Sequence, residues 1–462
     1  MCAMMLTANN IEQSNRIGTI INSSAFNTTL VVVSMLFIPL SELFGELIYN
    51  VPFVFERAYL TFLGFVGIGI FVLNICLNKK FDFLTIICLL LIFLAGISVA
   101  YSKPTQSIPF FIISGHVEEV FHYYAYFFLF YSSTKINMSS DAKFVIIAFI
   151  TIGLIHNFFG VFQLFGFRIS DDSYNNKEMH EQLRCIYGLT SNCNFYAGLA
   201  TIVTSISCVT YFVKKVPIFD YKWISLIFIM FFCALCSSTR LGILGVAATL
   251  FFLITLVIIT FLQKKKILMK NINWPEFNLN KIPVIIVISI LSCLVVYMAF
   301  PQLLVPSLNE FLGDINDLSS TKNIDNLGSL RGQVWRFSVE YLVNVNFLTG
   351  TGIGNFIDVF FTNPRMHESP QIVNFAHNEY LHIFVTQGIF SFVTYMTLYV
   401  TCIIKSIKLI MYSRNNVLKK IKIIFLFSLL CYMTQAFFNC NIFETYLYFW
   451  ILLGLSYSSR QS

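Results

Sequence analysis

Long apolar runs recur along almost the whole chain and decide what it can fold into. Each run has about 20 residues, the length that an α-helix needs to cross the hydrocarbon core of a membrane. The chain is 57% hydrophobic and only 11% charged, which excludes a soluble protein of 462 residues. The sequence therefore predicts an all-α polytopic membrane protein. The twelve expected spans are residues 29–49, 59–77, 84–101, 115–132, 144–166, 186–213, 221–239, 241–262, 282–300, 381–404, 423–438 and 442–457.

The basic residues of the short loops predict how these spans are oriented. Lysine gathers in alternate loops, and twelve spans place all of those loops on the cytoplasmic side together with both termini. The first residues lack the charged and apolar regions of a signal peptide. The predicted organisation is a cytoplasmic segment at 1–28, nine transmembrane helices at 29–300, a large outer loop at 301–380, and three transmembrane helices with a cytoplasmic C-terminus at 381–462.

The large outer loop is expected to carry short surface helices. Residues 334–346 mix Trp335 and other apolar residues with Arg336 and Glu340, a pattern typical of a helix that lies on a membrane. The polar stretch 313–326 predicts irregular structure. Ordered loops of this length tend to be functional rather than simple connections.

Arginine and lysine are distributed differently between the two sides. With these spans, 17 of the 20 lysines lie in or beside cytoplasmic loops. Seven of the 10 arginines lie outside them, and a guanidinium presents a planar fork that suits phosphate oxygens. These arginines are Arg57, Arg168, Arg184, Arg240, Arg331, Arg336 and Arg365.

Arg240 is the sole charged residue between Trp223 and Leu262. A charge within apolar sequence costs roughly 3 kcal/mol on insertion scales unless it is paired. Because two expected spans abut at Arg240, it should mark a tight turn at the membrane surface. It is either an anchor that reaches into the interface or a functional residue, and the small polar residues 237–239 beside it favour function.

His377 and Asn378 stand just before the tenth expected span. They are either an interfacial histidine with a helix-capping asparagine or part of a site. The positive end of the helix dipole disfavours an imidazolium and favours a bound anion, and a neutral imidazole can accept a proton from a hydroxyl. Glu379 and His382 are nearby groups for the same role.

Two further segments offer polar groups on the outer side. Arg331, taken alone, fits a solvated loop charge. Arg184 precedes the Gly/Ser/Asn-rich run 187–194, which either is an interfacial turn or lets a headgroup approach the backbone.

Other motifs predict no metal or nucleotide site. The glycines of 350–354 are not followed by the Lys-Ser/Thr of a phosphate-binding loop, so they predict a turn. The spacing of His116, Glu118, Glu119 and His122 is not a defined metal motif, although the cluster could bind a cation or pair with the outer arginines. Most cysteines lie within apolar runs. Cys185 and Cys193 could pair in an oxidising compartment, although their spacing alone does not favour a disulfide.

Several of these segments together resemble the O-antigen ligase and polymerase superfamily of bacterial envelope proteins. In ligases of this superfamily a glycine follows the His-Asn pair after nine residues, and here it is Gly388. The chain departs from the pattern at Val393, where ligases carry Gly, Thr or Tyr. The matching segments are Arg184 with 188–194, Ser237–Arg240, Arg331 with Trp335, 347–356 and 376–381.

This resemblance implies a transferase at the periplasmic face of the bacterial inner membrane. Its donor is a glycan on undecaprenyl diphosphate, and its acceptor is lipid A–core for a ligase, another repeat unit for a polymerase, or a protein Ser or Thr. The expected catalytic residues are His377 as base and Arg240 and Arg331 on the diphosphate. The expected substrate-binding residues are Arg184, Asn192, Asn194, Trp335, Asn378 and Glu379, with no cofactor, metal or nucleic acid.

A secondary transporter or flippase is the alternative from a different class, since twelve spans are common among transporters. Transporters tend to have internal repeats and mid-membrane sites. We find no repeat, and the charges of interest are expected near the outer surface. The mid-span pair His156 and Asn157 is expected to bridge helices instead.

Overall fold

The computed structural model describes residues 18–45, 54–78, 82–101, 120–167, 185–265, 274–320, 327–344, 347–357, 359, 375–439 and 443–461. Within these residues every regular element is helical and there is no strand. The helices are α2 (Ser24–Phe44), α3 (Val54–Asn78), α4 (Phe83–Tyr101), α5 (Val120–Thr134), α6 (Ala142–Leu164), α8 (Cys193–Val213), α9 (Tyr221–Cys236), α10 (Arg240–Lys264), α11 (Lys281–Ala299), α12 (Pro301–Ser320), α13 (Leu327–Asn344), α15 (Glu379–Tyr412), α16 (Asn416–Ala436) and α17 (Phe443–Tyr457).

Each predicted span overlaps one helix of this bundle, and eight of the described helices are long and apolar enough to cross a membrane. The described parts of α5, α9 and α17 are shorter than a span requires. α16 is long enough but carries three lysines in its first two turns. The all-helical membrane fold is thus confirmed, whereas the count of twelve spans stays a prediction.

α8 is the centre of the bundle, and all its residues from Phe195 to Val213 are buried. It packs against α6, α9, α10 and α16. Small residues permit this close approach: a Cβ on Gly245 of α10 would lie 2.0 Å from the hydroxyl of Thr201 on α8. The peripheral helices α3 and α11 instead expose large apolar side chains such as Phe62 and Leu294, as lipid-facing helices do.

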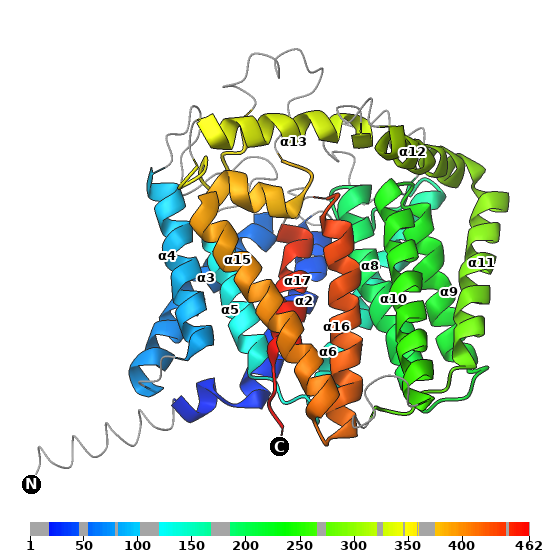
Figure 1. Cartoon of the computed structure of the whole chain (residues 1–462), viewed down its shortest axis with the longest axis horizontal. Coiled ribbons are helices and arrows are strands. Elements are labelled where there is room, and N and C mark those ends of the chain that lie inside the picture. The colour runs from blue at the N-terminus through cyan, green and yellow to red at the C-terminus, as the bar shows by residue number, and fades with distance from the viewer. Residues whose placement is uncertain are drawn as a thin grey trace, which may run out of the picture.

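α12 and α13 lie crosswise over the end of the bundle that is away from the C-terminus (Figure 1). The surface helix expected at 334–346 is confirmed as α13, which begins earlier, at Leu327. The irregular structure expected from residue 313 onward is wrong as far as Ser320, because α12 continues to that residue. The polar residues there belong to one face of an amphipathic helix: Ser307, Glu310 and Asp314 follow the helical spacing of three and four residues.

α15 is broken at Gly388, whose φ of 77° is left-handed. The segment 347–352 repairs the broken hydrogen bonds: Thr351 N–H donates to the Val385 carbonyl and Gly352 N–H to that of Thr386, both at 2.9 Å. A Cβ at residue 388 would lie 2.1 Å from the Leu348 carbonyl oxygen. The glycine of the ligase pattern is therefore required here by both φ and space, and the glycine-rich segment is confirmed as a turn.

Candidate functional site

Two turns at the end covered by α12 and α13 share one local structure. Ser238 and His377 are the non-glycine residues with positive φ in the described part of the chain, at 53° and 48°. Each is followed by an extended residue that caps a helix, Thr239 for α10 and Asn378 for α15. Left-handed backbone costs such residues about 1–2 kcal/mol each, so the surrounding structure must hold both turns in place.

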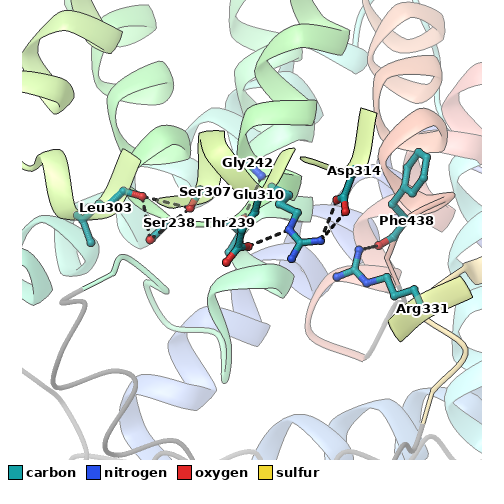
Figure 2. A network of polar contacts seen from close by, with 10 residues as sticks. Ser238, Thr239, Gly242, Leu303, Ser307, Glu310, Asp314, Arg331 and Phe438 are labelled. Carbon is teal, nitrogen blue, oxygen red and sulfur yellow. Dashed lines mark hydrogen bonds and ion pairs between the residues drawn. The ribbon is translucent and has the colours of Figure 1, made fainter. Parts of the chain in front are cut away.

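Arg240 is the first residue of α10, in the tight turn that the sequence predicts. Its Nε donates to Glu310 at 2.9 Å, and its Nη1 donates to both carboxylate oxygens of Asp314 at 2.8 and 3.1 Å. Figure 2 shows both carboxylates reaching from α12 to one guanidinium. The turn is also linked to α12 by Ser238, whose hydroxyl donates to the Leu303 carbonyl at 2.9 Å. Sequence reasoning missed these acidic partners.

Arg331 and Trp335 lie one turn apart on α13 and attach this helix to two segments, of which Figure 2 shows the contact of Arg331. Nη1 of Arg331 donates to the Phe438 carbonyl at 2.6 Å, just after α16. Nε1 of Trp335 donates to the Ala376 carbonyl at 2.9 Å, one residue before His377. The Arg-x-x-x-Trp spacing thus places a guanidinium over the start of α15.

His377 is partly buried at the mouth of α15, beside Arg331. Burial chiefly, together with the positive charge of Arg331 and the nearby His382, lowers the pKa of its imidazole to about 3. The ring is therefore neutral at pH 7 and keeps a lone pair. Arg331 and His377 therefore offer two chemical functions: the guanidinium can stabilise an anion, and the imidazole can accept a proton.

The turn 187–194 is held by side chains rather than open to solvent. Asn192 caps α8, and its Oδ1 accepts from the Asn194 N–H at 2.8 Å. Ser191 donates its N–H and hydroxyl to Glu444 at 2.8 and 2.6 Å. The Asn194 carbonyl accepts from the amide of Asn439 at 3.2 Å. Because Asn439 follows the residue that Arg331 contacts, this turn and α13 meet at the same segment.

The sequence was compared with models of known protein families. Residues 225–396 match the family model described as O-Antigen ligase. This part of the chain is similar to the O-antigen ligase family. The superfamily that the motifs predict is thus confirmed, while no curated protein matches the chain.

The matched segment contains Arg240, Arg331 and His377, whereas the turn 187–194 precedes it. Gly388 and Val393 are also within the match. Val393 is exposed on α15, away from the buried face of that helix. The roles assigned to these residues stay predictions.

Two expected substrate-binding residues face the protein interior next to His377. Glu379 is buried and accepts a hydrogen bond from the Tyr399 hydroxyl at 3.3 Å. Asn378 is buried as the cap of α15, its Oδ1 accepting from the Leu381 N–H at 3.0 Å. Both residues therefore have a structural role, and any contact of theirs with substrate stays a prediction.

Arg184 lies outside the described residues, and so do His116, Glu118 and Glu119. The residue after Arg184 is described: Cys185 forms a disulfide with Cys193, the first residue of α8. The expectation from spacing is therefore wrong, because the intervening turn folds back on itself. Asn157 bridges helices as expected, contacting Tyr196 of α8 and Met230 of α9, whereas His156 Nδ1 accepts from the Leu189 N–H of the turn 187–194.

Proposed function

We propose that this protein transfers a glycan from undecaprenyl diphosphate to an acceptor hydroxyl at the periplasmic face of the inner membrane. The transfer that the family match favours is O-antigen ligation to lipid A–core. One observation carries the proposal: α13 brings the Arg331 guanidinium beside the neutral imidazole of His377 inside the segment that matches the family model.

The chemistry of the transfer explains why these groups are needed. The acceptor oxygen forms a bond to the anomeric carbon of the donor sugar, and the bond from that carbon to the diphosphate oxygen breaks. The hydroxyl proton goes to His377, and the electron pair of the broken bond leaves on the diphosphate. Since a diphosphate is a stable anion, it needs positive charge more than protonation, and Arg331 and Arg240 supply that charge.

Three features support a periplasmic site. The lysine-rich loops assign the opposite end of the bundle to the cytoplasm. The crosswise helices α12 and α13 lie away from the C-terminus (Figure 1). The disulfide between Cys185 and Cys193 adjoins the turn next to the site, and disulfides persist in oxidising compartments such as the periplasm.

A second candidate is polymerisation, in which the acceptor is another repeat unit instead of lipid A–core. Val393 favours it, because ligases carry Gly, Thr or Tyr at this position. Transfer to a protein hydroxyl would use the same site. All three reactions share the donor and differ only in the acceptor, so the residues around the diphosphate do not distinguish them.

The proposal is tested in cells with Arg240→Ala and His377→Ala, compared with Arg336→Ala as a control on the exposed face of α13. We expect both site variants to stop surface glycan assembly at normal protein levels and the control to leave it intact. Normal assembly with both site variants would refute the proposal.

Gel analysis of a deletion strain then separates the acceptors. A ligase leaves lipid-linked polymer and no capped glycan. A polymerase leaves lipid A–core capped with a single repeat unit. Normal lipopolysaccharide together with loss of a glycoprotein would indicate transfer to protein.

A further inference from the structure

The candidate site has two halves, one around Arg240 under α12 and one around His377 under α13. The Arg240 half carries more negative than positive charge. One guanidinium is contacted by two carboxylates, those of Glu310 and Asp314, which lie four residues apart and therefore on the same side of α12. Arg240, Glu310 and Asp314 together carry a net negative charge, so they would repel a diphosphate headgroup. The headgroup cannot take the same nitrogens while both carboxylates hold them.

We propose that Glu310 and Asp314 occupy the places of the two phosphoryl groups, and that α12 is a lid that releases Arg240 when the lipid diphosphate binds. This inference rests on the proposed function, since it takes Arg240 as a diphosphate ligand. Carboxylate and phosphate oxygens accept the same forked hydrogen bonds from a guanidinium. Binding of the headgroup is then an exchange of one anionic partner for another.

The exposure of the ion pairs makes this exchange feasible. The side chain of Glu310 is 57% exposed and that of Asp314 is 24% exposed, whereas that of Arg240 is 16% exposed. The Arg240–Glu310 pair is open to water and contributes little net stability, because solvent screens the attraction and ordering two side chains costs entropy, whereas the Arg240–Asp314 pair is partly buried. A multiply charged headgroup can displace such partners.

The packing of α12 gives the lid a fixed end and a loose end. Its first turns are anchored by buried Leu303 and Leu304 and by the hydrogen bond from Ser238. Beyond them, Leu312 and Ile315 are exposed. Pro306 separates the two parts and has no N–H to bond to the residue four positions earlier, so the helix is weakest there. The carboxylates stand on the loose part.

The test measures binding of farnesyl diphosphate, a water-soluble lipid diphosphate, to the purified full chain in lipid nanodiscs. The compared proteins are the wild type, E310Q/D314N, R240A and the triple variant that combines all three changes. E340Q is the matched control, since it removes one carboxylate from the neighbouring helix α13. Gel filtration verifies that each variant is folded, and D314N alone replaces the double variant if that is poorly recovered.

We expect E310Q/D314N to bind roughly tenfold more tightly than the wild type, because neutral amides no longer repel the headgroup. E340Q should change the affinity less than twofold, and R240A should remove the gain in the triple variant. If R240A weakens binding but E310Q/D314N does not strengthen it, the lid is refuted and the proposed function stands. If R240A has no effect in either background, Arg240 is no diphosphate ligand and both proposals fail for this residue.

Discussion

α12 and α13 cross the same end of the bundle, yet they bring opposite charges to the turns that they cover (Figure 1). α12 places two carboxylates on Arg240, while α13 places the guanidinium of Arg331 beside His377. The two turns have the same backbone geometry, with a left-handed residue followed by an extended helix cap. The covering helix, rather than the turn, therefore determines whether each half is ready for an anion.

The two covering helices also differ in how firmly they are seated. α13 buries Val334, Phe337 and Leu342 against a cluster that includes Phe356 and Val385. In the second half of α12, Leu312 and Ile315 are exposed. Burying an aliphatic or aromatic side chain contributes about 1.5–3 kcal/mol, so α13 is fixed over His377 while part of α12 is not fixed over Arg240. In our proposal the His377 half is preassembled, and the Arg240 half has to open.

The largest effect is expected from His377→Ala, which removes the proton acceptor from the preassembled half. We predict that transfer falls by roughly 10³-fold, within the usual contribution of a general base. The rate of glycan transfer from a lipid-diphosphate donor measures it. Thr397→Ala, an exposed change on the same helix, should leave the rate unaltered. A loss of less than fivefold for His377→Ala would show that the imidazole is not the base.

Gly388→Ala tests whether the segment under α13 supports the His377 half. A side chain there meets the Leu348 carbonyl at 2.1 Å in addition to the strained φ, so we predict a loss of about 3 kcal/mol or more of stability. Gly166→Ala is the matched control, with a φ of 87° but nothing within 4 Å of the added Cβ. It should cost only about 1–2 kcal/mol. Thermal unfolding in detergent compares the two, and equal losses would show that the contact with Leu348 does not matter.

Arg331→Ala removes the cation from the same half, and we predict a fall in transfer of roughly 10²-fold. Arg336→Ala, on the exposed side of the same helix, should stay within about twofold. Because Arg331 also holds the Phe438 carbonyl, folding is checked by the unfolding temperature of each variant. Equal activities of the two variants would mean that α13 contributes no specific charge.

A smaller effect is expected in the pH dependence of kcat/KM. The pKa of His377 is lowered to about 3, so the imidazole stays neutral as the pH falls from 8 to 5, and no loss of activity from its protonation should appear in that range. Since Arg331 contributes to this lowering, Arg331→Ala should move the acidic limb of the profile to higher pH. An acidic limb near pH 6.5 in the wild type would contradict the geometry.

The lowered pKa of His377 also makes the free energy of unfolding depend on pH. An unfolded histidine binds a proton below about pH 6.5, whereas the folded His377 does so only near its lowered pKa. The unfolded state then binds more protons, and the protein loses stability as the pH falls between these two values. His377→Asn should lessen that loss.

The sequence predicts the parts of the fold that depend on local pattern. Runs of about 20 apolar residues suffice to locate the helices of the bundle. The Arg-x-x-x-Trp and His-Asn motifs suffice to select residues that the fold brings together under α13. Gly388 is visible as a motif residue, but its reason is the carbonyl of Leu348, which only the folded chain brings close.

The contacts that the sequence does not reveal join segments far apart in the chain. Arg240 and Asp314 are separated by 74 residues, and nothing local to either predicts the pair. The signal available was the i, i+4 spacing of Glu310 and Asp314, which places two carboxylates on one helical face. The overall polarity of 313–326 hid it, because a mixed surface helix and a loop have similar composition.

The most direct test of the account is transfer by the purified protein in nucleotide-free vesicles that contain an undecaprenyl-diphosphate-linked glycan and an acceptor. Undecaprenyl diphosphate and transferred glycan are measured together. The account predicts that the wild type releases one lipid diphosphate for each glycan transferred and that His377→Ala and Arg331→Ala release almost none. Glycan transfer without release of the lipid diphosphate, or undiminished transfer by both variants, would contradict it.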